Sequence, residues 1–295
     1  MIDKISYTEG KVRQIALRSF DREYADLIVD SMRKNGVEVL LETTIKDIEL
    51  VKEADLDSLK PGQFKVNLNV SDSKTIELSP NSILVATGRY STVEQAFDAS
   101  KVDIKIDEKT RKVRSSFDMT TTPNIYALGD INNDKPELTP VAIAAGRKLI
   151  NRLTVEGLEN DYMNYNNVAT TIFTYPEYSC VGMSEEKAYI EFGREGVDVY
   201  RCETFAPHLK MKKSKVIARR DTGNVVGLHF FGEEAGEIIQ GFSMLMHKGL
   251  KIDSVLEHED FIWFKNGQKE NYESSPVSKQ SKDLDSSQKQ IFVIA

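Results

Sequence analysis

Apolar residues recur at helical spacing near the start of the chain. With Ser31 they mark one face of an amphipathic helix: Phe20, Tyr24, Leu27, Ile28 and Met32. Asp21 is placed to cap this helix, and Lys34-Asn35-Gly36 to end it. The apolar run 37–41 then predicts a short buried strand of a parallel sheet. A strand before this helix, the helix itself and the strand 37–41 would together form one half of a dinucleotide-binding domain.

Apolar and polar positions alternate over residues 44–83, with Phe64, Val66, Leu68 and Val70 as the apolar positions. This period of two predicts a β-meander with an exposed turn at 60–62. The following sequence SILVATGRYS runs apolar residues into Gly88-Arg89, which predicts a strand ending at that pair.

Two further patterns lie before residue 160. Residues 102–116 predict a hairpin that turns at 107–110. A short apolar strand at 125–128 then leads into a Gly129-Asp130 turn. Pro140 favours the first position of an Ala-rich helix from about Val141 to Leu153.

Beyond residue 160 the order predicted is strand, helix and meander. Ser184 is placed to cap a helix with two glutamates in its first turn. The turn 221–224 closes a hairpin whose second strand is 225–231. Residues 235–247 form a helix with a broad apolar side, which is typical of a helix facing a core or a partner.

Composition narrows the class of protein. A chain of 295 residues with 40% hydrophobic and 29% charged residues predicts about two globular domains. No apolar run reaches the ~20 residues of a membrane helix, and the first residues have no apolar signal core, so a cytoplasmic location without membrane partners is expected. The net charge of −7 argues against a nucleic-acid partner.

The residues of common catalytic chemistry are sparse. Cys180 and Cys202 are too far apart in sequence for a CxxC-type redox pair, and each is expected to be a buried small hydrophobe. The four histidines show no metal-ligand spacing, so no metal site is predicted. A catalytic role for His258 would call for a proline directly after it and a glutamate on a following helix, and the sequence has neither. No catalytic residue is therefore assigned.

Two groups of residues have the chemistry to hold a cofactor. Asp130 could accept hydrogen bonds from ribityl hydroxyls, and the helix after Thr139 would direct its N–H groups at negative charge; the alternative is a solvated turn residue. Arg13 and Arg18 could grip a phosphate, the alternative being two surface arginines. No G-x-G-x-x-G turn is present in the sequence.

Three stretches resemble the NADPH-dependent flavoprotein disulfide reductases, most closely thioredoxin reductase and then glutathione reductase. ALGDI followed by LTPVAIAAGRKL is similar to their second flavin-binding segment. VRxxxLRxFD resembles the signature for the 2′-phosphate of NADPH, with Arg13 and Arg18 at the matching positions. From NNVATTIF onward the chain resembles their dimerisation domain, and EYxCxG and FxPxxxM favour thioredoxin reductase.

The resemblance implies FAD and NADPH as cofactors. It places Gly88 near the dinucleotide, Asp130 and Thr139 beside the flavin, and Glu137 towards the nicotinamide. It also implies a homodimer formed through the C-terminal domain, or a heterodimer with a full-length reductase, and a thioredoxin-like substrate.

The fold class that follows is α/β, with an α+β C-terminal part. Residues 1–89 are expected to be the second half of an NADPH-binding domain and 90–160 the returning segment of an FAD-binding domain. Residues 161–264 are expected to form the dimerisation domain and 265–295 a disordered tail.

The function implied is NADPH-dependent disulfide reduction of the thioredoxin reductase type. The sequence has no CxxxxC redox pair, no His-Pro…Glu motif and no N-terminal FAD-binding half, so the chain is expected to be truncated and inactive alone. Two alternatives remain: a non-catalytic homologue that dimerises with and regulates a full-length reductase, and a weak NADPH-binding module.

Overall fold

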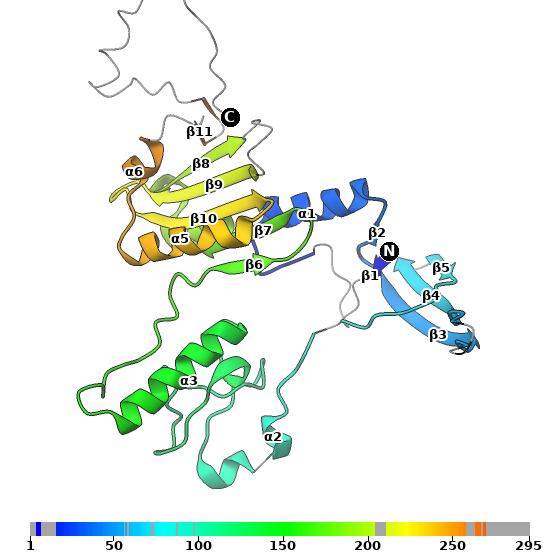
Figure 1. Cartoon of the computed structure of the whole chain (residues 1–295), viewed down its shortest axis with the longest axis horizontal. Coiled ribbons are helices and arrows are strands. Elements are labelled where there is room, and N and C mark those ends of the chain that lie inside the picture. Colours follow the sequence, from blue (N-terminus) through cyan, green and yellow to red (C-terminus); the bar gives the residue numbers. More distant parts are fainter. Residues whose placement is uncertain are drawn as a thin grey trace, which may run out of the picture. The chain divides into compact units, whose positions relative to one another are not determined.

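The computed structural model describes residues 4–6, 16–55, 57, 59–71, 74–86, 88–96, 98–203, 211–257, 263–266 and 268–269. The chain divides into two compact units (Figure 1). Unit 1 comprises Met1–Ile5, Ile15–Val39 and Ala169–Ala295, and unit 2 comprises Ser6–Gln14 and Leu40–Val168.

Unit 1 is built on a seven-stranded sheet with the strand order β12-β11-β8-β9-β10-β7-β6, in which every neighbouring pair is antiparallel. The strands are β6 (Thr170–Ile172), β7 (Glu177–Gly182), β8 (Val197–Glu203), β9 (Met211–Arg219), β10 (Val225–Gly232), β11 (Trp263–Lys265) and β12 (Gln268–Lys269). The hairpin at 221–224 and its second strand are thereby confirmed. The predicted tail begins at residue 265, whereas β11 and β12 carry the sheet to Lys269; residues 270–295 lie outside the described part.

Alternation along the strands gives the sheet two buried faces. On one face Leu228 and Phe230 pack against Ile239 and Met246 of α5 (Ala235–His247), whose bounds agree with the prediction. The short α6 (Ile252–Leu256) joins the same core. The opposite face is packed against α1 (Arg22–Lys34) and α4 (Glu185–Phe192), with η3 (Arg194–Gly196) following α4.

The position of α1 corrects a prediction. The helix was expected in a dinucleotide-binding half with a parallel sheet, but Tyr24 and Ile28 pack against Tyr178 and Phe231 of the seven-stranded sheet. The strand β2 (Glu38–Leu40) pairs with β1 (Lys4–Ser6) in a separate two-stranded sheet. The antiparallel sheet covers the apolar side of α1, and its contacts place Ile15–Val39 in unit 1.

Unit 2 contains the predicted meander. It consists of β3 (Thr44–Lys52), β4 (Gln63–Ser71) and β5 (Lys74–Leu78), paired antiparallel in that order. Of the four apolar positions of the alternation, Val66 and Leu68 are buried, whereas Phe64 and Val70 are half-buried.

The remainder of unit 2 has one long helix and several short elements. These are α2 (Val93–Ala96), η1 (Ala99–Val102), η2 (Gly129–Ile131) and α3 (Thr139–Thr154). The predicted Ala-rich helix is therefore confirmed, with Pro140 in its first turn. The predicted hairpin at 107–110 is present as a turn closed by the Ile106–Val113 bridge.

Two predicted strands of unit 2 do not form. Residues 125–128 contribute only the Met119–Tyr126 bridge, and residues 82–86 pair with no strand of the described chain. Leu84 and Val85 are exposed as a result. A buried parallel strand requires hydrogen-bonded neighbours, so the apolar run alone is not sufficient.

None of the helices within the described residues combines the length and the apolarity needed to cross a membrane.

Candidate functional site

A cluster of charged side chains gathers at the start of α3 in unit 2. Arg89 Nη2 donates to Asp130 Oδ2 at 2.6 Å and lies 4.0 Å from Glu137 Oε2. Lys112 Nζ donates to the other oxygen of Glu137. The structure thus brings together Asp130 and Glu137, which the resemblance assigns to the cofactor, with Arg89, which directly follows Gly88. Because Asp130 and Glu137 are partly exposed, both carboxylates are accessible to a ligand.

The turn that carries Asp130 is packed closely on α3. Gly129 has a φ of +70°, and a Cβ at this position would lie 3.2 Å from Cβ of Ala142. Gly88, on the other side of the cluster, has a φ of +101°. Leu138 precedes α3 without a side-chain cap, and Thr139 at the start of α3 is exposed. The first N–H groups of α3 and the Asp130 carboxylate therefore stand at the same end of the helix, where N–H groups favour an anion.

Asn132 was not singled out from the sequence, yet it fixes this loop. Its buried side-chain amide donates to Phe117 O at 2.8 Å and to Ala127 O at 3.0 Å, and its oxygen accepts from Ser115 Oγ. An asparagine directly after GDI is a weak signal on its own, because asparagine is common in turns.

The predicted phosphate grip is only partly described. Arg13 lies outside the described residues. Arg18 is exposed on the turn that precedes α1, and within the described residues its guanidinium has no hydrogen bond or ion pair. By contrast, Arg22 in the first turn of α1 is paired with Asp26 at 2.6 Å. Among the described residues, Arg18 is therefore without a partner that would compete with an anionic ligand.

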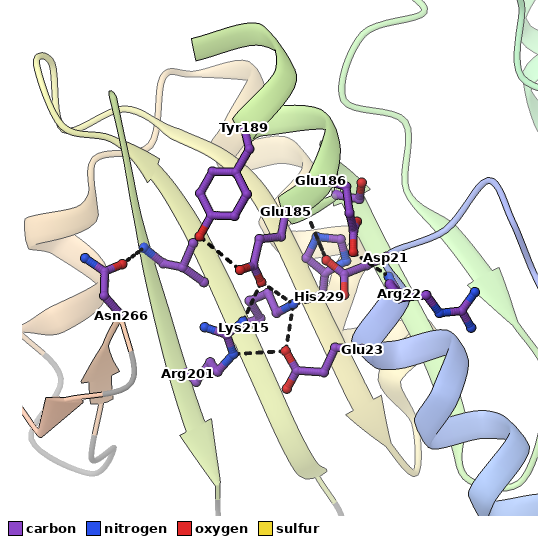
Figure 2. A network of polar contacts seen from close by, with 12 residues as sticks. Asp21, Arg22, Glu23, Glu185, Glu186, Tyr189, Arg201, Lys215, His229 and Asn266 are labelled. Atoms are coloured by element: carbon purple, nitrogen blue, oxygen red, sulfur yellow. Dashed lines mark hydrogen bonds and ion pairs between the residues drawn. The ribbon is translucent and has the colours of Figure 1, made fainter. Parts of the chain in front are cut away.

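A network of charged side chains in unit 1 includes Asp21, which directly follows this turn (Figure 2). Lys215 of β9 donates to Asp21 Oδ1 at 2.9 Å and to Glu185 Oε2 at 2.8 Å, and it lies 2.8 Å from Glu23 Oε2. Arg201 of β8 donates to Glu23 and Glu185. Lys215 and Asp21 have almost no exposed side-chain surface. An ammonium buried this deeply is retained because carboxylates surround it.

The acidic residues at the two helix starts also cap each other's helices. The sequence predicted that Asp21 caps α1, but its side chain makes no cap hydrogen bond there. Instead its Oδ2 accepts from the N–H of Glu185 in α4 at 3.0 Å. Glu186 of α4 in turn accepts from the N–H of Arg22 at 3.1 Å. Ser184 accepts from Lys187 N and caps α4 as predicted. Each helix start therefore supplies a carboxylate to the other.

The pKa values in this network follow from burial and charge. Burial alone raises the pKa of Asp21, but the positive charge of Lys215, that of His229 when protonated, and the Glu185 N–H hold it below its usual value. Burial lowers the pKa of Lys215, and the carboxylates reverse this and raise it. Burial lowers the pKa of His229, which Asp21 opposes in part. Asp21 and Lys215 are both charged at neutral pH, whereas His229 is neutral.

Cys202 is buried as expected, whereas Cys180 is partly exposed, and the two cannot form a disulfide with each other. Cys202 on β8 and Cys180 on β7 are separated by β9 and β10, so the two lie about 14 Å apart. Disulfides require Cα atoms within ~7 Å. Burial raises the pKa of the Cys180 thiol to about 11. His258 lies outside the described residues, and within them no cluster of His, Cys, Asp or Glu is arranged to hold a metal ion.

Comparison with known proteins gives matches over most of the chain. Residues 11–146 match the model described as pyridine nucleotide-disulphide oxidoreductase, and residues 168–261 match its dimerisation domain. A similar protein is the Drosophila melanogaster protein named thioredoxin reductase 2, mitochondrial, which is 35% identical over 254 residues. The match covers 83% of this chain and 47% of that relative, so the chain spans about half its length. These matches imply the use of FAD and NADPH.

Proposed function

Because the chain belongs to the pyridine nucleotide-disulphide oxidoreductase family, we propose that it takes part in NADPH-dependent disulfide reduction of the thioredoxin reductase type. In this proposal the chain supplies the 2′-phosphate contact, one wall of the flavin site and the dimerisation unit. The observation that carries it is the meeting of Arg89, Asp130 and Glu137 at the start of α3.

The residues at α3 fit a flavin. FAD, when bound, would carry electrons between NADPH and a disulfide. Asp130 would accept hydrogen bonds from hydroxyl groups of the flavin side chain, and the uncapped start of α3 would favour the anionic edge of a reduced ring. Arg89, which donates a hydrogen bond to Asp130, would hold the carboxylate in place. Gly129 keeps the turn against Ala142 and so sets where Asp130 stands.

Flavin binding tests this assignment. We expect Asp130→Ala to weaken FAD binding by at least about tenfold, because a charge-assisted hydrogen bond of about 1.5–3 kcal/mol is lost. Asp134→Ala, in the same loop, is the matched control and should leave FAD affinity unchanged. FAD titration followed by flavin fluorescence measures both variants. Equal affinities for the Asp130 variant and the wild type would remove Asp130 from the flavin site.

The 295 residues alone are proposed not to reduce disulfides. A thiolate is the species that attacks a disulfide, and the Cys180 thiol, with its pKa raised to about 11, stays protonated at neutral pH. Cys202 is buried in the sheet. We expect negligible NADPH-dependent reduction of a small aromatic disulfide, with FAD added, by this polypeptide. Turnover that survives replacement of both cysteines would show that another group performs the reduction.

A second candidate function is a dimerising partner of a full-length reductase. It is favoured by exposed apolar side chains on α5, the helix that covers one sheet face, and on the loop between β6 and β7: Phe173, Tyr175, Ile238, Met244 and Leu245. Such a surface suits either a second copy of this chain or a related dimerisation unit. A weak NADPH-binding module without electron transfer remains the third possibility, supported by the exposure of Arg18 on its turn.

The substrate proposed is a thioredoxin-like protein, by analogy with the named relative. The proposal includes no nucleic-acid or membrane partner. The cytoplasmic location expected from sequence remains a prediction, and the relative is named as mitochondrial.

A further inference from the structure

The turn that presents Arg18 is held at both of its ends. The N–H of Phe20 donates to Leu17 O at 3.0 Å, and Arg22 Nη1 donates to Ala16 O at 3.2 Å. Ala16 and Asp21 are buried, whereas Arg18 is exposed between them. The position of the Arg18 backbone is therefore decided by what holds the ends of the turn.

Apolar contacts fix one side of the turn to the seven-stranded sheet. Leu17 and Phe20 pack against the cluster that contains Tyr24 and Tyr178. The rings of Phe20 and Tyr178 meet edge to face with centroids 6.0 Å apart. Apolar packing of this kind is compatible with small shifts of the turn, because it is not directional.

The charged network fixes the other side, and its contacts are directional. Asp21 ends the turn and is held by Lys215 of β9 and by the N–H of Glu185 (Figure 2). The next backbone N–H, that of Arg22, is held by Glu186. A displaced turn would leave a buried charge without its partner, so the turn has one favoured position.

We propose that Asp21 and Glu186 are positioning residues that orient Arg18 towards the 2′-phosphate of an adenine nucleotide, with Lys215 as their anchor in the dimerisation sheet. This inference rests on the proposed function, since it assumes that Arg18 meets that phosphate. A guanidinium binds a phosphate through directed hydrogen bonds, so a small rotation of the turn weakens the contact. The sheet that serves dimerisation would thereby also set nucleotide selectivity.

The test is calorimetric titration of the full chain with adenosine 2′,5′-bisphosphate and with 5′-AMP. The wild type is expected to bind the bisphosphate at least about tenfold more tightly, which is 1.4 kcal/mol. Asp21→Asn and Glu186→Ala are expected to reduce this ratio at least threefold and to leave 5′-AMP affinity unchanged. Glu186→Gln, which keeps an acceptor for the Arg22 N–H, should restore the wild-type ratio.

The control is Asp198→Asn in the same sheet. Asp198 is a buried carboxylate of β8 that pairs with Arg220 and Lys265. This variant should lose thermal stability but keep the ratio. An equal fall of the ratio in Asp198→Asn would reduce the effect to general destabilisation and overturn the inference.

Two further outcomes are separable. If the wild type shows no preference for the bisphosphate, the proposed 2′-phosphate contact fails and the inference fails with it. If the wild type shows the preference and the folded Glu186→Ala variant keeps it, the positioning role alone is wrong. Glu186 is exposed, so this variant remains informative if Asp21→Asn does not fold.

Discussion

His229 is a buried histidine whose hydrogen bonds define its tautomer. Its Nε2 lies 2.9 Å from Met183 O, a group that only accepts, so Nε2 carries the proton. Its Nδ1 then accepts from the hydroxyl of Tyr178 at 2.8 Å. The neutral ring therefore satisfies both neighbours, whereas a second proton on Nδ1 would break the bond from Tyr178.

This arrangement predicts a pH dependence of stability. The pKa of His229 is lowered by burial in the folded chain and is about 6.5 in the unfolded chain. Between these two values the unfolded chain holds one proton more, so the free energy of unfolding falls as pH drops below about 6.5, by up to about 1.4 kcal/mol per pH unit. Urea unfolding between pH 8 and pH 5 measures this slope.

His229→Gln is the matched variant, because its amide donates to Met183 O without titrating. Its slope between pH 6.5 and pH 5 should be smaller than that of the wild type. The lowered pKa of Asp21 does not interfere, since that carboxylate loses its stabilising effect only as pH falls below its unfolded value near 4. Identical slopes in the two proteins would show that His229 is not the titrating group.

The close approach of the backbones of β7 and β10 at Gly182 requires a glycine. Gly182 has a φ of +82°, and a Cβ there would lie 2.2 Å from Val226 O and 2.9 Å from Cε of Met246. Gly193 after α4 has a similar φ of +73° but no heavy atom within 4 Å of its Cβ position. The two glycines therefore separate the cost of backbone conformation from that of a clash.

We expect Gly193→Ala to lower the free energy of unfolding by about 1–3 kcal/mol, because a φ of +73° with a ψ of 159° is a backbone conformation that essentially only glycine adopts. Gly182→Ala should lose at least about 2 kcal/mol more, because a backbone carbonyl must also move. Chemical denaturation of both variants measures the difference. Similar losses of unfolding free energy in the two variants would mean that the backbone around Gly182 moves at little cost.

The elements most visible in the sequence are those with a complete local pattern. The helix at 235–247 and the meander of β3 to β5 were predictable because their apolar spacing matches the face that is buried. The strands expected at 82–86 and 125–128 were not correct, since a parallel strand depends on neighbours that its own residues do not reveal.

The charged network around Lys215 could not be predicted from the sequence, because its members come from distant parts of the chain. Alternation in β9 puts Lys215 on the same face as Ile217, but it does not say what covers that face. Its partner Asp21 is 194 residues away, and that residue was assigned only as a cap. The proximity of Asp130, Glu137 and Thr139 was predictable because they lie within ten positions of one another, whereas Arg89 joins Asp130 and Glu137 only through folding. Their role at a cofactor stays a prediction.

The apolar surface of α5 predicts the oligomeric state. Met244 is 67% exposed and lies on α5 with Ile238 and Leu245, so a second copy of the chain is expected to cover this surface. Met244→Glu should shift the protein from dimer to monomer at micromolar concentration, because it buries a charge in the interface. Sedimentation velocity measures the shift.

Ile190→Glu serves as the control for this surface. Ile190 is 86% exposed on α4, which packs on the opposite face of the sheet, and its replacement should leave the dimer intact. A wild-type monomer, or a Met244→Glu dimer as stable as the wild type, would place the contact elsewhere.

The most direct test of the proposed function is the comparison of NADPH with NADH on the wild type and Arg18→Ala, followed by nucleotide fluorescence. The wild type should bind NADPH at least about tenfold more tightly than NADH, and Arg18→Ala should remove most of that preference, because a charge-assisted phosphate contact of about 1.5–3 kcal/mol is lost. Equal affinity of the wild type for the two nucleotides, or an unchanged preference in Arg18→Ala, would contradict the assignment of this chain to the NADPH side of a disulfide reductase.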